Sequence, residues 1–167
     1  ELPVALPPGP FSLSRVAGFG NSALLWSPAK GIMAYSTQDV VVLEDLETQK
    51  QWFAQHSSDC SITCLAWTSD CSLVASGSSA SSLALRIWSN GKDESSSSLV
   101  PHSALDSLDA SGLTALSFVH EDTQLVAASQ SGMLIFDVLQ GTVVLRTQKT
   151  HVDCVAPVGA GAFVTGG

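Results

Sequence analysis

Short apolar runs alternate with small polar turns along this 167-residue chain. The clearest stretch is Ile62 to Ser89, ITCLAWTSDCSLVASGSSASSLALRIWS. Apolar, β-branched and aromatic residues fill three runs in it, and Ser, Asp and Gly fill the turns between them. The pattern predicts three short antiparallel strands, Ile62 to Trp67, Leu73 to Ser76 and Leu83 to Trp88.

The same order of runs and turns recurs at Leu113 to Asp137 and, in a weaker copy, at Ser22 to Asp45. Trp88 and Phe136 hold equivalent places in the two stronger copies. A period of about 40 to 50 residues with several strands per unit is typical of propeller blades. Because one such unit cannot bury both of its faces, stacking against its neighbours must supply the core.

Further strands complete the expected units. They are Ser22 to Ser27, Ile32 to Thr37, Val40 to Asp45, Lys50 to Gln55, Ser98 to His102, Thr142 to Gln148, Asp153 to Val158 and Ala162 to Thr165. We therefore predict an all-β chain of about three and a half propeller blades. The expected division is a proline-rich lead-in over residues 1–20, blades over 21–55, 60–102 and 113–148, and the start of a fourth blade over 151–167.

These repeats resemble the WD40 family, whose unit has a histidine ahead of the first strand, a polar turn, a strand ending in small residues and a closing Trp-Asp or similar pair. The matching residues are the histidines His56, His102 and His151 and the closing pairs Trp88-Ser89 and Phe136-Asp137. No glycine precedes these histidines, and the turn aspartate expected before Trp88 or Phe136 is missing. The resemblance therefore implies a WD40 architecture whose Asp-His-Ser/Thr-Trp hydrogen-bond network is incomplete.

Three blades and part of a fourth do not close the ring of about seven blades that is commonest in this family. An open propeller exposes the faces of two blades and unpaired strand edges. We therefore expect the chain to be a fragment of a larger propeller, whose remainder is missing or is supplied by another chain.

The composition suits sheets that are buried on both faces, with 45% hydrophobic and only 13% charged residues. The formal net charge is -8, and the seven Lys and Arg residues are scattered, so no basic stripe is available to neutralise phosphates. We therefore expect no direct nucleic-acid partner and no membrane partner. No run approaches the ~18 apolar residues of a membrane-spanning helix.

Candidates for catalytic or metal chemistry are few. None of the four cysteines forms a C-x-x-C pair, and we expect them to behave as structural thiols in a reducing compartment. His56, Cys60 and Cys64 fall short of the four converging ligands of a structural zinc site. No Gly-x-Ser-x-Gly elbow or phosphate-binding glycine loop occurs. We predict no catalytic, metal-binding or cofactor-binding residue, with a hydrolase or metal enzyme as the rival class.

Two features are candidates for regulation and binding. The possible phosphorylation loop comprises Ser95, Ser96, Ser97 and Ser98. It follows Asp93-Glu94 and is either a plain flexible loop or a site where phosphate adds about two negative charges. Trp52, beside Phe53 on an expected outer strand, is the tryptophan that we expect to face a partner.

A propeller with no predicted catalytic or cofactor-binding residues is more typical of a scaffold that binds other proteins. Val40 to Leu46 with Gln51-Trp52, and Leu73 to Trp88 with its serine-rich insertion, resemble a family of WD-repeat proteins of centrioles and cilia. That resemblance implies a cytoplasmic, microtubule-associated scaffold that binds centriole-wall proteins and serves centriole integrity and cilium assembly. The alternatives are the WD-repeat subunit of Elongator, a scaffold for transfer-RNA modification, and scaffolds for mitogen-activated kinases.

Overall fold

The structure is a computed structural model that describes residues 23–55, 61–78, 85–90, 99–105, 112–148, 151–159 and 162–167. These residues form fourteen strands, arranged as three four-stranded antiparallel sheets and one two-stranded hairpin. In each sheet the strands follow one another in chain order, so consecutive strands are always hydrogen-bonded neighbours. The chain is therefore all-β, as the sequence predicts.

Each sheet is one blade. Blade 1 contains β1 (Leu24–Ser27), β2 (Ile32–Thr37), β3 (Val40–Asp45) and β4 (Gln51–Gln55). Blade 2 contains β5 (Ile62–Trp67), β6 (Leu73–Ser78), β7 (Leu85–Ser89) and β8 (Val100–Leu105). Blade 3 contains β9 (Leu113–Val119), β10 (Gln124–Ser129), β11 (Gly132–Asp137) and β12 (Thr142–Gln148), and blade 4 is the hairpin of β13 (Cys154–Pro157) and β14 (Phe163–Gly166).

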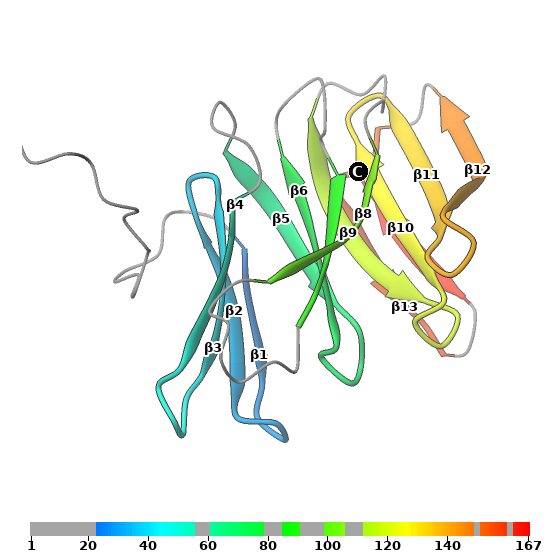
Figure 1. Cartoon of the computed structure of the whole chain (residues 1–167). Coiled ribbons are helices and arrows are strands. Elements are labelled where there is room, and N and C mark those ends of the chain that lie inside the picture. Colours follow the sequence, from blue (N-terminus) through cyan, green and yellow to red (C-terminus); the bar gives the residue numbers. More distant parts are fainter. Residues whose placement is uncertain are drawn as a thin grey trace, which may run out of the picture.

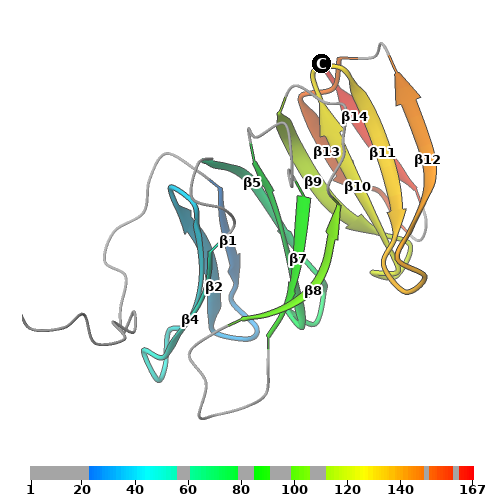
Figure 2. The same ribbon diagram turned by 45° about the horizontal axis from the view of Figure 1, so that its top comes forward.

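The blades stand side by side in chain order (Figures 1 and 2). The first strand of each blade contacts the first strand of the next, so β1, β5, β9 and β13 form one continuous inner row. A row of first strands with the later strands fanning outward is the arrangement of propeller blades around an axis. The described residues thus form part of a propeller, with its inner row complete across all four blades.

The predicted strands agree closely with the observed ones. Ile62–Trp67 and Thr142–Gln148, among others, have the expected bounds. The outer strand of blade 2 differs most, because it runs from Val100 to Leu105 instead of from Ser98 to His102. Leu105 pairs with Leu85 at the far end of β7, so pairing with the neighbouring strand carries β8 beyond the segment that its own residues favour.

Two apolar clusters between blades form the core, because alternate residues of a strand point to opposite faces of its sheet. The cluster between blades 1 and 2 consists of Ala34, Val41, Leu43, Ala54, Ile62, Leu65, Val74, Trp88 and Leu99. The cluster between blades 2 and 3 consists of Cys64, Ala66, Ala75, Leu85, Ile87, Leu113, Leu116, Phe118, Leu125, Ala127, Leu134, Phe136 and Val138. Blade 2 is therefore covered on both faces, which accounts for its apolar strands.

Equivalent residues pack at equivalent places in successive blades. Leu65 on β5 belongs to the cluster toward blade 1, and Leu116 on β9 belongs to the cluster toward blade 2. Trp88 and Phe136 pack against the preceding blade in the same way and oppose equivalent residues of β6 and β10. This register confirms the equivalence of Trp88 and Phe136 that the sequence predicts.

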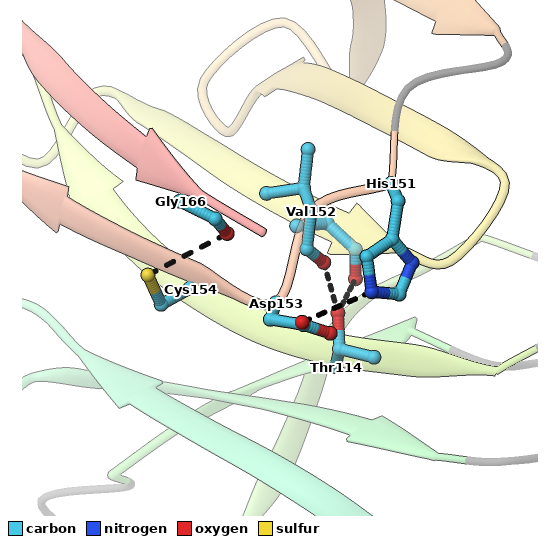
Figure 3. A network of polar contacts seen from close by, with 7 residues as sticks. Thr114, His151, Val152, Asp153, Cys154 and Gly166 are labelled. Carbon is cyan, nitrogen blue, oxygen red and sulfur yellow. Dashed lines mark hydrogen bonds and ion pairs between the residues drawn. The ribbon is translucent and has the colours of Figure 1, made fainter.

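Threonine side chains also link the inner strands of neighbouring blades. Thr63 Oγ1 on β5 donates a hydrogen bond to the carbonyl oxygen of Leu113, at 2.5 Å. Thr114 Oγ1, at the equivalent position of β9, donates to the carbonyl oxygen of Val152, at 2.7 Å (Figure 3). Blades 2 and 3 thus each begin with a threonine that is bonded to the backbone at the start of the next blade.

Candidate functional site

A pocket of about 340 Å³ opens on the inner row, beside the turns that join the first two strands of blades 2 and 3. Its lining residues are Leu25, Leu65, Ala66, Trp67, Ser69, Leu116, Ser117, Phe118, Asp122 and Pro157. Most of them are apolar, and the polar residues among them are Ser69, Ser117 and Asp122. Because all four blades contribute, the pocket exists only where the inner strands stand next to one another.

The turn of blade 2 at the pocket mouth is held by Asp70. The Asp70 Oδ1 atom accepts a hydrogen bond from Thr68 Oγ1 at 2.7 Å and from the Ser72 backbone N–H at 2.9 Å. These bonds, chiefly the one from Thr68 and then those from Ser72, lower the pKa of Asp70 to about 2. The Asp70 carboxylate is therefore charged at neutral pH and fixes the shape of the turn.

The matching turn of blade 3 has an unusual backbone. His120, Glu121 and Asp122 all have positive φ angles, of 52°, 55° and 65°. Non-glycine residues in the left-handed region each cost roughly 1–2 kcal/mol, so surrounding contacts must hold this turn in place. One such contact is the carboxylate of Asp122, whose Oδ2 accepts hydrogen bonds from the Ser69 backbone N–H at 2.7 Å and from Ser69 Oγ at 2.5 Å.

The Ser69–Asp122 contact joins the turns of two blades at the pocket mouth. Sequence reasoning missed both the contact and the pocket. A usable signal was present, since the segments Thr68 to Leu73 and Val119 to Gln124 have equal length and connect equivalent strand positions in successive repeats. A contact between their polar side chains can be predicted only when the two blades are known to stand side by side.

The sequence predicts that Trp52 and Phe53 face a partner. In this structure both side chains pack within the chain. Trp52 packs against the cluster between blades 1 and 2, with the Lys50 ammonium 5.0 Å above its ring. Phe53 is only 8% exposed and lies in a third cluster with Tyr35 and Val42. Contact of Trp52 or Phe53 with a partner remains a prediction that their burial does not favour.

The histidines are not structurally equivalent, which corrects the expectation from their spacing. His102 is an exposed residue within β8, whereas His151 precedes β13 and its Nε2 lies 2.9 Å from Asp153 Oδ2 (Figure 3). Blade 2 extends from Ile62 to Leu105 and blade 3 over the shorter range from Leu113 to Gln148, so similarly spaced histidines fall in different parts of the repeat. His56, Cys60, the Ser95–Ser98 loop and the lead-in over residues 1–20 lie outside the described residues.

The closing tryptophan network differs from blade to blade. In blade 2, Trp88 Nε1 donates a hydrogen bond to Ser76 Oγ at 2.9 Å. In blade 3, Phe136 has no ring N–H to donate, and Ala127 stands at the position of Ser76. The hydrogen bond between tryptophan and serine is thus present in blade 2 and has no counterpart in blade 3.

The cysteines that the structure describes differ in burial. Burial raises the pKa of the Cys64 thiol to about 12, so this residue is a neutral packing group at physiological pH. Cys71 is also buried, and Cys154 is exposed; all three are free thiols. Within the described ranges, no three His, Cys, Asp or Glu side chains gather as a metal-binding group. Nor does any helix there have the length and apolar character needed to cross a membrane.

The stacked four-stranded blades and their repeated packing faces define a WD40-type propeller. The chain matches the family described as the anaphase-promoting complex subunit 4 WD40 domain over residues 24–157, and it belongs to that family. No curated protein matches the chain in sequence.

Two solved structures show the same fold. The crystal structure of RRP9 WD40 repeats is similar with a TM-score of 0.69 and 15% sequence identity, and the structure of U3-55K with a TM-score of 0.67 and 16% identity. Both likenesses cover 86% of this chain, but only 44% and 43% of the respective solved chains. This chain therefore spans less than half the length of those two propeller chains and corresponds to part of a propeller.

Proposed function

We propose that this chain is a non-catalytic part of a protein–protein interaction scaffold, and that the inner-row pocket receives a side chain of a protein partner. The observation that carries the proposal is the pocket itself, whose walls are apolar side chains from four inner strands. Its one carboxylate, that of Asp122, accepts hydrogen bonds from Ser69 and forms part of the pocket wall. Concave apolar sites with a few fixed polar groups are typical binding sites.

Membership of the family supports this proposal, since WD40 domains generally bind other proteins and the family takes its name from a subunit of a multiprotein complex. A propeller exposes loops at two ends and an outer rim, so it presents several surfaces at once. The fold by itself does not identify the partner.

The centriole and cilium are the cellular setting that we propose, together with a cytoplasmic and cytoskeletal location. The support is the sequence resemblance carried by Val40 to Leu46 and Leu73 to Trp88. Elongator and mitogen-activated kinase scaffolds are the alternative settings. Proximity labelling with the full-length protein distinguishes them: enrichment of centriole-wall proteins supports the first setting, and enrichment of Elongator subunits or of kinases contradicts it.

A pair of variants tests the pocket directly. Pro157 lines the pocket, and the next residue, Val158, is exposed and does not line it. We expect Pro157→Arg to remove proximity-labelled partners that the unmodified protein and the control Val158→Arg both retain. Identical labelling by both variants would contradict a role for the pocket.

A further inference from the structure

The carboxylate of the inner-row pocket keeps one oxygen for a ligand. A carboxylate can only accept hydrogen bonds, and Asp122 Oδ2 accepts both of those that come from Ser69. Asp122 Oδ1 accepts none from the described residues, and the Ser69 hydroxyl is already occupied as a donor to Oδ2. The turn of blade 2 therefore holds Asp122 in place and leaves Oδ1 available to a donor in the pocket.

Ser117 supplies a second acceptor in the same pocket. It lines the pocket although only 8% of the residue is exposed. Its hydroxyl donates a long hydrogen bond, of 3.4 Å, to the carbonyl oxygen of Phe118. No donor among the described residues reaches the Ser117 oxygen, so its lone pairs remain for a ligand. A buried acceptor of this kind favours an occupant that brings a donor.

The pocket walls suit an apolar stem that ends in a cation. Leu65, Leu116 and Phe118 are buried and line the pocket. Trp67 also lines it and is partly exposed, and the face of an indole ring attracts a cation. The described residues of the lining include no lysine or arginine, so no basic side chain of the wall competes for the carboxylate.

The rim of the pocket is acidic. Asp70, Glu121 and Asp122 lie in the two turns at the pocket mouth, and the Asp70 and Glu121 side chains are exposed. Lys30 opposes them, but its charge is the smallest of the causes that lower the pKa of Asp70. The whole chain has a formal net charge of -8 in addition. A concave site with an excess of one charge favours a partner of the opposite charge.

We propose that the inner-row pocket selects an arginine side chain of the protein partner, an inference that rests on the binding function proposed above. The aliphatic stem contacts the apolar walls, and the guanidinium group lies against Trp67 and donates hydrogen bonds to Asp122 Oδ1 and Ser117 Oγ. Arginine fits better than lysine, because its planar fork of donors serves two acceptors and stacks on a ring. An apolar side chain would leave both acceptors without a donor.

Asp122→Asn separates recognition of the ligand from the structure of the pocket wall. The amide oxygen can still accept both hydrogen bonds from Ser69, which keeps the two turns in contact. The amide nitrogen then stands in the place of Oδ1 and is a donor, which a guanidinium group cannot use. Glu121→Gln is the matched control, because it removes the same charge from the adjacent residue, which does not line the pocket.

A library of short peptides serves as the probe. The peptides have randomised flanks and one fixed residue, which is arginine, citrulline, lysine or leucine, and they are selected on the whole chain. We expect arginine to be enriched about tenfold over each of the others, because only arginine combines the charge with the fork of donors. Asp122→Asn should lose this enrichment, Glu121→Gln should keep it, and Pro157→Arg, which blocks the pocket, should lose all selection.

The outcomes that contradict arginine selection also separate it from the binding function. Equal enrichment of arginine and citrulline, abolished by Pro157→Arg, contradicts a charged ligand but leaves the pocket as a binding site. Lysine enriched as strongly as arginine contradicts the guanidinium contacts. Enrichment that Pro157→Arg does not change contradicts both proposals, because the peptides then bind elsewhere. The comparison of arginine with citrulline requires no variant, so it decides the charge even if Asp122→Asn has a lower thermal midpoint.

Discussion

At the scale of single residues, one pair of facing positions differs in residue type between blades 2 and 3 but is similar in combined size. Cys64 lies opposite Gly77 in blade 2, and the equivalent pair in blade 3 is Ala115 and Ala128. A Cβ on Gly77 would lie 2.5 Å from Cys64 Sγ, closer than packed atoms tolerate. A sulfur on one strand therefore requires a glycine on the other.

This pairing gives a stability prediction. We expect Gly77→Ala to lower the free energy of unfolding by about 1–3 kcal/mol, because it overpacks the cluster between blades 2 and 3. The double variant Cys64→Ala/Gly77→Ala, which copies blade 3, should recover most of that loss. Urea unfolding of the two variants measures both values, and an equal loss in both would show that the sulfur is not the obstacle.

A second residue-scale prediction concerns acid. Because the pKa of Asp70 is lowered to about 2 in the folded chain, its charged form contributes stability above the ordinary value of 3.8, and this contribution is lost as the pH falls from there through about 2. We expect Asp70→Asn to be less stable than the unmodified chain at pH 7 and to lose less stability between pH 5 and pH 2. The pKa of Asp45 is also lowered, so the stability of the variant should still decrease to some extent at low pH. Parallel stability curves for the two proteins would contradict the role of Asp70.

At the scale of strands and blades, the sequence predicts the elements well and their contacts poorly. Runs such as Val40 to Asp45 match the observed strands, because a short run of apolar and β-branched residues between polar turns favours a β-strand. The Ser69–Asp122 contact escapes prediction because it joins two blades, and the inner-row pocket because it is lined by four. Trp52 gives a second example: its outer strand is predicted, but the cluster against which it packs includes residues of the next blade.

The threonine links give a prediction at this scale. Thr114→Val removes the hydrogen bond to the Val152 carbonyl, and we expect a loss of about 0.5–1.5 kcal/mol, concentrated where blade 4 joins blade 3. Hydrogen exchange should accelerate in β13 and β14 and stay unchanged in β5 to β8. Thr142→Val, at the exposed start of β12, is the matched control. Uniform acceleration throughout the chain would contradict a local link.

At the scale of the whole molecule, the exposed apolar residues concentrate where the chain has no neighbouring blade. Besides Leu24 and Trp26, these positions include Val144 and Leu145 on β12, next to the incomplete blade 4. Leu145 lies opposite Ile135 as Trp52 lies opposite Leu43, yet Trp52 is packed and Leu145 is exposed. The difference follows from the presence of a full blade beside one and a two-stranded hairpin beside the other.

The central claim is that successive four-stranded units stand face to face with their inner turns in contact. Oxidation of the double variant Ser69→Cys/Asp122→Cys tests it most directly, with peptide mapping to separate the new bond from native cysteines. We predict a disulfide within one molecule between residues 69 and 122, because their side chains are in hydrogen-bond contact across two blades. The pair Ser69→Cys/Leu139→Cys should stay reduced. Absence of the bond between residues 69 and 122, or equal cross-linking of both pairs, would contradict the stacked arrangement.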